Sequence, residues 1–120
     1  MKIDRQKVYE KYNGRCAYCG RKIEYKDMQV DHIIPKVKYS PLEEIDVDDI
    51  SNLNPSCRIC NHYKRASNLE SFREMIAKIP CKLERDSYIY RIGEAYGFYD
   101  GNQRNVSFYF EQLEKPKEDT

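Results

Sequence analysis

The hydrophobic positions at the start of the chain repeat with helical spacing. Val8 and Tyr12 lie four residues apart, so they fall on one face of a helix. Asp4 can cap the start of that helix, and Gly14 can close its end. The pattern therefore predicts a short helix over Asp4–Asn13.

The middle of the chain has the pattern of two strands followed by a helix. Met28–Ile34 is β-prone and stops at Pro35, which predicts a strand. Leu53–Ser56 is expected to be the returning strand, and Arg58–Arg65 a short helix. The stretch between the strands, Lys36–Ile50, is acidic and contains a proline, so we expect an irregular loop.

The second half of the chain is predicted to be mainly helical. Ser67–Glu70 has the form of a capping box that would start a helix, and Pro80 would end it. A second helix is expected over Leu83–Tyr96, closed by Gly97, and a strand over Val106–Phe110. The apolar residues expected to be core in the first helix are Leu69, Phe72, Met75, Ile76 and Ile79, and those that form one stripe of the second are Ile89, Ile92 and Tyr96.

Composition limits the class of protein. A chain of 120 residues suggests one domain, and a mean hydropathy of −0.89 with no Trp leaves a modest core that a bound metal could reinforce. No apolar segment follows Met1, and no apolar run reaches the length of a membrane span. We therefore expect a cytoplasmic protein with no membrane partner.

Charge is spread unevenly along the chain, although the formal net charge is only +1. Residues 1–40 hold ten Lys and Arg against five Asp and Glu, whereas residues 41–50 hold five acids and no base. Basic segments suit a phosphate backbone, and ordinary solubilising residues are the alternative. The acidic run is expected to be a solvated face.

Two Cys-x-x-Cys pairs are the strongest chemical signal: Cys16 with Cys19, and Cys57 with Cys60. In a reducing compartment such pairs favour metal over disulfides. Four thiolates fill the tetrahedral shell of Zn²⁺ and leave no open position for hydrolysis, so the site would be structural. An iron site and two redox pairs are the alternatives, and Cys81 is expected to be a free thiol.

The region bounded by these pairs resembles the HNH endonuclease family. The matching stretches are Val30–Pro35 (Val-Asp-His-Ile-Ile-Pro), Ser51–Pro55 (Ser-Asn-Leu-Asn-Pro) and Cys57–Lys64 (Cys-Arg-Ile-Cys-Asn-His-Tyr-Lys). The likeness covers roughly residues 12–66 and includes both cysteine pairs. It implies a ββα-metal fold and hydrolysis of DNA phosphodiester bonds.

The resemblance also implies roles for four residues. Asp31 and Asn61 would supply oxygen ligands to a catalytic Mg²⁺ or Mn²⁺. His32 would be the general base, since an imidazole can accept a proton from water near neutral pH; a half-buried structural histidine is the alternative. Asn52 would brace the His32 loop through hydrogen bonds, with Asn54 as the competing residue. As alternatives, Asp31 could cap a turn, Asn52 could be a plain turn residue, and Asn61 could cap the helix or satisfy the zinc turn.

Three residues near the end of the motif are candidates to bind nucleic acid: Lys64, Arg65 and His62. A solvated surface is their alternative role. Arg65 also departs from the family pattern, because some members carry a further metal ligand four residues after Asn61. Arginine cannot ligate a cation, so the catalytic metal would have two protein ligands.

These patterns together predict an α+β protein with an HNH ββα-metal motif stapled by a four-cysteine zinc site. Residues 1–68 would form the nuclease core, residues 69–114 a helical extension packed on it within the same domain, and residues 115–120 a flexible tail. The alternative function is a zinc-stabilised nucleic-acid-binding module without catalysis, which would need neither Asp31 nor His32. One active site cuts one strand, so cutting both would need a homodimer or two events.

Overall fold

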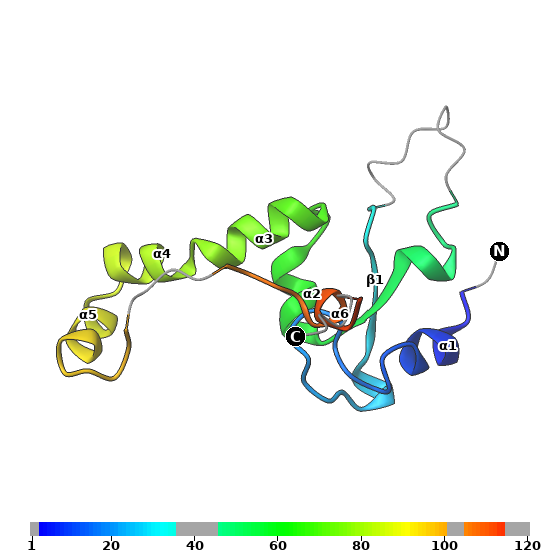
Figure 1. The fold of residues 1–120 in the computed structure, drawn as a ribbon, viewed down its shortest axis with the longest axis horizontal. Helices are drawn as coiled ribbons and strands as arrows, with labels where there is room; N and C mark the ends of the chain where they lie inside the picture. Colours follow the sequence, from blue (N-terminus) through cyan, green and yellow to red (C-terminus); the bar gives the residue numbers. More distant parts are fainter. Residues whose placement is uncertain (1–2, 36–45, 101–104, 115–120) are drawn as a thin grey trace, which may run out of the picture. The chain divides into compact units, whose positions relative to one another are not determined.

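The structure is a computed structural model that describes residues 3–35, 46–100 and 105–114. The chain divides into two compact units (Figure 1). Unit 1 comprises the described residues within Met1–Leu69 and Ser107–Thr120, and unit 2 is Glu70–Val106. The expected loop over Lys36–Ile50 lies largely outside the described residues, as does the expected tail over residues 115–120.

Unit 1 is built on a two-stranded sheet and short helices. The helix predicted near the start of the chain begins as expected, because the Asp4 carboxylate accepts a hydrogen bond of 3.2 Å from the Lys7 amide, but it ends earlier than predicted. The elements of unit 1 are the α-helices α1 (Arg5–Glu10), α2 (Arg58–Lys64) and α6 (Tyr109–Glu114), the 3-10 helices η1 (Tyr25–Asp27) and η4 (Ile50–Asn52), and the strands β1 (Gln29–His32) and β2 (Leu53–Ser56).

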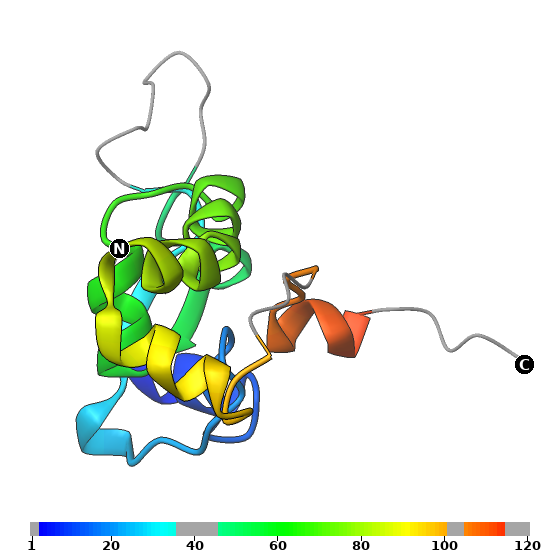
Figure 2. The same ribbon diagram turned by 90° about the vertical axis from the view of Figure 1, so that its left-hand side faces the viewer.

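The sheet places the candidate catalytic residues at a defined register. β1 and β2 are antiparallel, with Gln29 opposite Ser56, Asp31 opposite Asn54, and His32 opposite Leu53. The helix α2 follows β2 after a single residue and packs against β1. Figures 1 and 2 both draw α2 in the same part of the molecule as β1. The predicted strand–strand–helix order and the α+β class are confirmed.

The C-terminal segment of unit 1 packs on the turn that carries the first cysteine pair. The amide of Tyr109 donates to the Tyr18 carbonyl (3.1 Å), and the amide of Phe110 donates to the Ala17 carbonyl (2.8 Å). The Tyr18 ring meets the rings of Phe108 and Phe110 edge to face, at centroid distances of 5.3 and 5.8 Å. The strand predicted over Val106–Phe110 is therefore wrong. Its β-prone side chains are aromatic anchors, and a helix begins at Tyr109 instead.

This return to unit 1 bears on the expected grouping of residues 69–114. Of the residues grouped as 69–114, those up to Val106 lie in unit 2 from Glu70 on, and those from Ser107 lie in unit 1, while the domain boundaries themselves stay a prediction. The hydrogen bonds to Ala17 and Tyr18 explain this division, since they tie the segment to the cysteine turn. The packing of the extension on the core stays a prediction.

Unit 2 is helical, as expected, but its helices break at other positions. They are α3 (Leu69–Ala77), whose first residue still belongs to unit 1, α4 (Ile79–Asp86) and α5 (Tyr88–Ala95). Pro80 lies in the first turn of α4 rather than at the end of a helix, where its missing N–H costs nothing. The helix predicted over Leu83–Tyr96 is interrupted at Ser87, whose hydroxyl accepts a hydrogen bond from the Tyr90 amide (3.1 Å) and caps α5.

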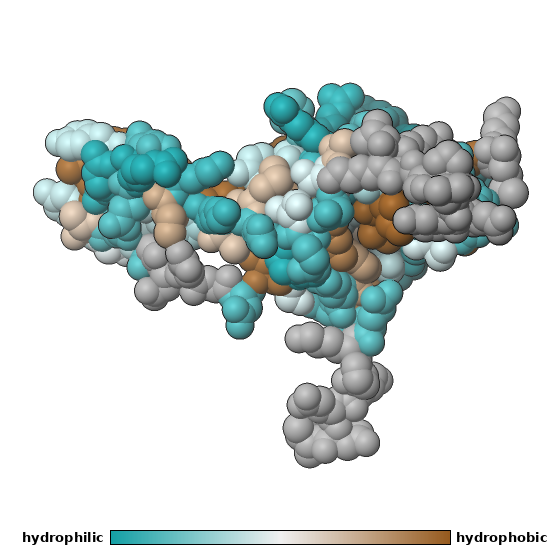
Figure 3. Space-filling view, turned by 90° about the horizontal axis from the view of Figure 1, so that it is seen from above, coloured by the Kyte–Doolittle hydropathy of each residue, from teal (hydrophilic) through white to brown (hydrophobic). Residues whose placement is uncertain are grey.

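The apolar stripe of α5 is mostly exposed. Ile89 is 76% exposed and Tyr96 78%, so the predicted stripe does not form a core. Of the core residues predicted for α3, only Phe72 is fully buried. On the face drawn in Figure 3, hydrophilic residues cover much of the surface, and hydrophobic residues form separate patches among them. The largest part of the well-buried core therefore belongs to unit 1.

Candidate nuclease site and its metal centre

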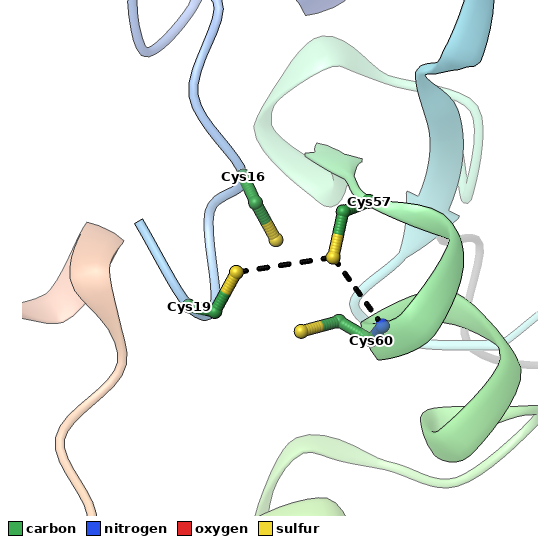
Figure 4. A group of neighbouring side chains, drawn as sticks. All are labelled: Cys16, Cys19, Cys57 and Cys60. Atoms are coloured by element: carbon green, nitrogen blue, oxygen red, sulfur yellow. Dashed lines mark hydrogen bonds between the residues drawn. The ribbon is translucent and has the colours of Figure 1, made fainter. Parts of the chain in front are cut away.

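The four predicted zinc ligands come together in unit 1. The Sγ atoms of Cys16, Cys19, Cys57 and Cys60 all lie within 4.8 Å of one another, and none is in a disulfide. Figure 4 shows the four side chains pointing toward one another, two from the turn before β1 and two from the start of α2. Tetrahedral Zn²⁺ with Zn–S bonds of about 2.3 Å separates its sulfurs by roughly 3.8 Å. The Cys19 and Cys57 sulfurs are 3.8 Å apart, so the set is consistent with zinc.

Local backbone geometry explains how each pair presents two thiols on one side. Gly20 has a φ of +81° and its amide donates to the Cys16 carbonyl (3.0 Å), which closes the first turn. A side chain there would also press on Tyr109, whose ring lies 3.2 Å from the position of a Cβ atom. In the second pair, Cys57 is the N-cap of α2, and its sulfur accepts a hydrogen bond from the Cys60 amide (3.4 Å).

The crowding of the thiols shifts the pKa values of Cys16, Cys19 and Cys60. The hydrogen bond from the Cys60 thiol lowers the pKa of Cys16 to about 4, and the same bond, with burial, raises the pKa of Cys60. Burial also raises the pKa of Cys19. Without a cation the cluster resists further ionisation, and a bound metal would take the place of its protons.

Asp31 is a buried residue of β1, and two donors hold its carboxylate. The Tyr18 hydroxyl donates a hydrogen bond to its carboxylate, and the Lys64 ammonium lies 3.2 Å from the carboxylate oxygens. Burial raises the pKa of Asp31, while the Tyr18 hydrogen bond and the charge of Lys64 oppose that shift. Burial and the Asp31 charge together raise the pKa of Tyr18, so its hydroxyl remains a donor. The turn between Cys16 and Cys19 is thus hydrogen-bonded directly to Asp31.

The structure buries Lys64, a candidate nucleic-acid contact that the sequence placed on a short exposed helix. Its side chain has no exposed surface, and besides Asp31 the ammonium donates to the carbonyls of His32 (3.2 Å) and Ser67 (2.9 Å). An ammonium with three oxygen partners has no donor left for a phosphate. Lys64 therefore compensates the buried charge of Asp31 and joins the end of α2 to β1.

Replacing Lys64 by Met should destabilise the protein by about 3–5 kcal/mol, because it leaves the Asp31 charge buried without its cation. The loss should shrink at acidic pH. There Asp31 is protonated in both the folded and the unfolded states, and a raised carboxyl pKa no longer affects stability. Urea unfolding across a range of pH checks this.

Arg58→Met is a matched control for this experiment, because Arg58 is an exposed cation at the other end of α2. Its effect on the free energy of unfolding should stay within about 0.5 kcal/mol. Equal stability of the two variants would contradict the role given to Lys64.

His32 has an acidic partner that the sequence did not reveal. Its Nε2 lies 2.7 Å from Oδ1 of Asp48, and the two side chains are 19% and 22% exposed. Asp48 belongs to the acidic run that was expected to be a solvated face, so that expectation is wrong for this residue. A carboxylate bonded to one ring nitrogen fixes the ring and leaves the other nitrogen for a second partner. Five acids in one run gave no signal that singled out Asp48.

Asn52 ties together the two ends of the connector between the strands. Its Oδ1 accepts a hydrogen bond from the Ile34 amide (2.8 Å), and its Nδ2 donates to the carbonyls of Ile34 (3.1 Å) and Val47 (2.8 Å). Asn54, the competing residue, is fully buried and accepts a hydrogen bond from the Lys11 ammonium (3.2 Å) instead. Of the two, Asn52 is the one bonded to the segment that follows His32.

Asp31, His32 and Asn61 line one pocket of about 230 Å³. β1 contributes the adjacent residues Asp31 and His32, and α2 contributes Asn61. Arg65, the residue after α2, also lines the pocket. His62 is exposed and is not among the described residues that line it. The remaining lining residues are Val30, Pro35 and Ala66.

Arg65 has a strained backbone at the edge of this pocket. Its φ of 52° and ψ of −132° are those of the first central residue of a type II′ turn, a position that glycine favours. The turn closes through a hydrogen bond of 3.1 Å from the Ser67 amide to the Lys64 carbonyl. A non-glycine residue in such a conformation costs about 1–3 kcal/mol, so the fold around the turn must hold it in place.

Comparison with known proteins identifies the class of this site. Residues 16–67 match the model of the HNH endonuclease family, and they span both cysteine pairs, both strands and α2. The predicted resemblance to the HNH endonuclease family is confirmed over this segment. The match supports a nuclease-type function for the chain.

A solved structure supplies one further likeness. The chain is similar to the Type II-C Cas9 enzyme from Actinomyces naeslundii, with 26% sequence identity and a TM-score of 0.48. The match covers 60% of this chain and 7% of that one, so it concerns a small part of a much larger protein. No curated protein matches the chain. Among the residues that the structure describes, no helix has the length and apolar character needed to cross a membrane.

Proposed function

We propose that the protein is a metal-dependent HNH endonuclease that hydrolyses phosphodiester bonds in DNA. The observation that carries this proposal is the pocket in which Asp31, His32 and Asn61 meet. At one opening, the imidazole can act as a general base, and the carboxylate and amide oxygens can hold a metal ion that stabilises charge on a phosphodiester. The HNH match over residues 16–67 supports the same reaction class.

Two metals have separate tasks in this proposal. Zn²⁺ would be held by the four cysteine thiolates and would stabilise the fold without taking part in hydrolysis. The carboxylate of Asp31 and the amide oxygen of Asn61 are hard donors suited to Mg²⁺ or Mn²⁺. That second ion, when bound, would neutralise charge developing on the phosphate. With two protein ligands its affinity should be weak, and the Lys64 ammonium already beside Asp31 should weaken it further.

His32 acts as the general base in the proposed reaction. It takes a proton from water, and the water oxygen forms a bond to phosphorus. The bond between phosphorus and the 3′ oxygen breaks, and that oxygen takes a proton from solvent. Since Nε2 of His32 is bonded to Asp48, the base would be Nδ1, with Asp48 holding the ring and stabilising its protonated form. Asn52 would brace the backbone after His32.

DNA would be held mainly through its phosphate backbone. Arg65 lines the pocket and His62 lies on the exposed side of α2, so both remain proposed contacts. Lys64 is not part of this surface, because its ammonium is buried. Cleavage of both strands would need two copies of the protein or two successive events.

The test is a nicking assay on supercoiled plasmid with zinc-loaded protein. We expect nicked circles with Mg²⁺ or Mn²⁺, and intact plasmid when EDTA removes these ions but the zinc content is unchanged. Plasmid that is retarded on a gel without being cut under any of these conditions would instead support the non-catalytic nucleic-acid-binding module.

A further inference from the structure

Among the described residues that line the candidate pocket, Arg65 is the one permanent cation whose charge has no partner. Asp31 is compensated by the buried Lys64, and His32 is bonded to Asp48. Arg65 lines the same pocket, is exposed, and its side chain has no hydrogen-bond or ion-pair partner among the described residues. A guanidinium presents several donors in a plane that matches the oxygens of a phosphate. Arg65 is therefore the pocket residue best suited to an anion.

The backbone at Arg65 gives an independent reason to look for a task for its side chain. The type II′ turn needs a positive φ at this position, and glycine would adopt it without strain. The turn is held from both sides by Lys64, whose carbonyl accepts from the Ser67 amide and whose ammonium donates to the Ser67 carbonyl. Because the same ammonium binds Asp31, the turn is fixed relative to the candidate metal ligand.

From these observations we infer that Arg65 is a catalytic residue whose guanidinium binds a non-bridging oxygen of the phosphate being cut. Its charge stabilises the negative charge that gathers on those oxygens as water attacks. This goes beyond a contact to neighbouring backbone phosphates, and it rests on the proposed nuclease function. Removing one such charged donor typically lowers kcat by about 10²- to 10³-fold.

Two variants separate the side chain from the backbone strain. Arg65→Gly removes the guanidinium and relaxes the turn, whereas Arg65→Ala removes the guanidinium and keeps the strain. We expect both to lose about 100-fold or more in kcat on plasmid. The thermal midpoint should be higher for Arg65→Gly than for Arg65→Ala. The difference in thermal midpoint would show that the turn is strained at residue 65. The equal loss of kcat in both variants would show that activity depends on the guanidinium.

A second substrate distinguishes a contact between Arg65 and the phosphate being cut from a contact between Arg65 and neighbouring backbone phosphates. Bis(4-nitrophenyl) phosphate with Mn²⁺ offers one phosphodiester and no flanking nucleotides. If Arg65 binds the phosphate being cut, both variants lose kcat on this compound as well as on plasmid. Loss on plasmid alone, or a rise in KM at constant kcat, would overturn the assignment and leave Arg65 as a backbone contact.

Failure of the wider proposal gives a different result. A wild-type protein that cuts neither substrate, at full zinc content, would remove the nuclease function and the assignment of Arg65 with it. A wild-type protein that cuts both substrates, beside an Arg65→Gly variant of equal kcat, would remove only the assignment of Arg65.

Discussion

Replacing His32 by Ala should abolish nicking of plasmid while leaving the zinc content and the fold intact. A positioned general base contributes about 10²- to 10⁴-fold to a rate, so the residual rate should fall by at least that factor. His32 is at the end of β1 and is not one of the buried residues of the core, and removal of its ring breaks one hydrogen bond, to Asp48. Nicking rates and zinc content measured on the same preparations check the prediction.

Gln29→Ala provides the control on the same strand. Gln29 lies on β1 three positions before His32. Within the described part of the chain it does not line the pocket, and its side chain donates only to the Asp27 carbonyl (3.3 Å). This variant should nick plasmid at the wild-type rate. A zinc-loaded His32→Ala protein that nicks as fast as Gln29→Ala would remove His32 from the role of base.

The framework of the site could be predicted from the sequence because its signals are local. Cysteine spacing fixes the geometry of each half-site, and the structure brings the four sulfurs within 4.8 Å of one another. The β-prone runs around Asp31 and at Leu53–Ser56 gave the two strands, and the second is observed with the predicted bounds. Asn61 directly follows Cys60 in α2, the helix that begins after Cys57. The cysteine spacing therefore also accounts for the presence of Asn61 in the pocket.

What surrounds these residues could not be predicted, because it depends on contacts between segments far apart in the chain. Tyr18 is 13 residues from Asp31 and Lys64 is 33 away, yet both donate to its carboxylate. A lysine at the end of a polar helix has the sequence pattern of a surface residue, and only the fold shows it buried. Asp48 is a similar case, since its partner His32 lies 16 residues earlier, across a connector of no regular pattern.

The helical half shows a different limit. The periodicity of apolar residues predicted helices correctly, but it did not tell a buried face from an exposed one. Ile89 and Tyr96 share a stripe and are both largely exposed. Helix spacing describes which residues share a face, whereas burial depends on what lies against that face.

Replacing Cys57 by Ser should unfold unit 1. The substitution removes one thiolate from the cluster but keeps a side-chain oxygen at the N-cap of α2, a position that serine favours. Loss of helix capping is thus not the cause of any large effect. Structural zinc contributes about 10–16 kcal/mol of apparent binding free energy in small domains, which matches or exceeds the whole stability of a typical fold. We expect zinc to be lost and the cooperative thermal transition of unit 1 to disappear.

Cys81→Ser is the matched control, because Cys81 is exposed, lies on α4 in unit 2 and is not one of the four clustered thiols. It should keep both the metal and the thermal transition. Loss of zinc should also affect the candidate catalytic site, because Tyr18 lies between two of the zinc ligands in the sequence and its hydroxyl donates to Asp31. A zinc-free unit 1 should therefore lose the position of the Asp31 carboxylate together with its fold. A soluble Cys57→Ser protein that unfolds cooperatively without zinc would contradict both the scaffold role and this link.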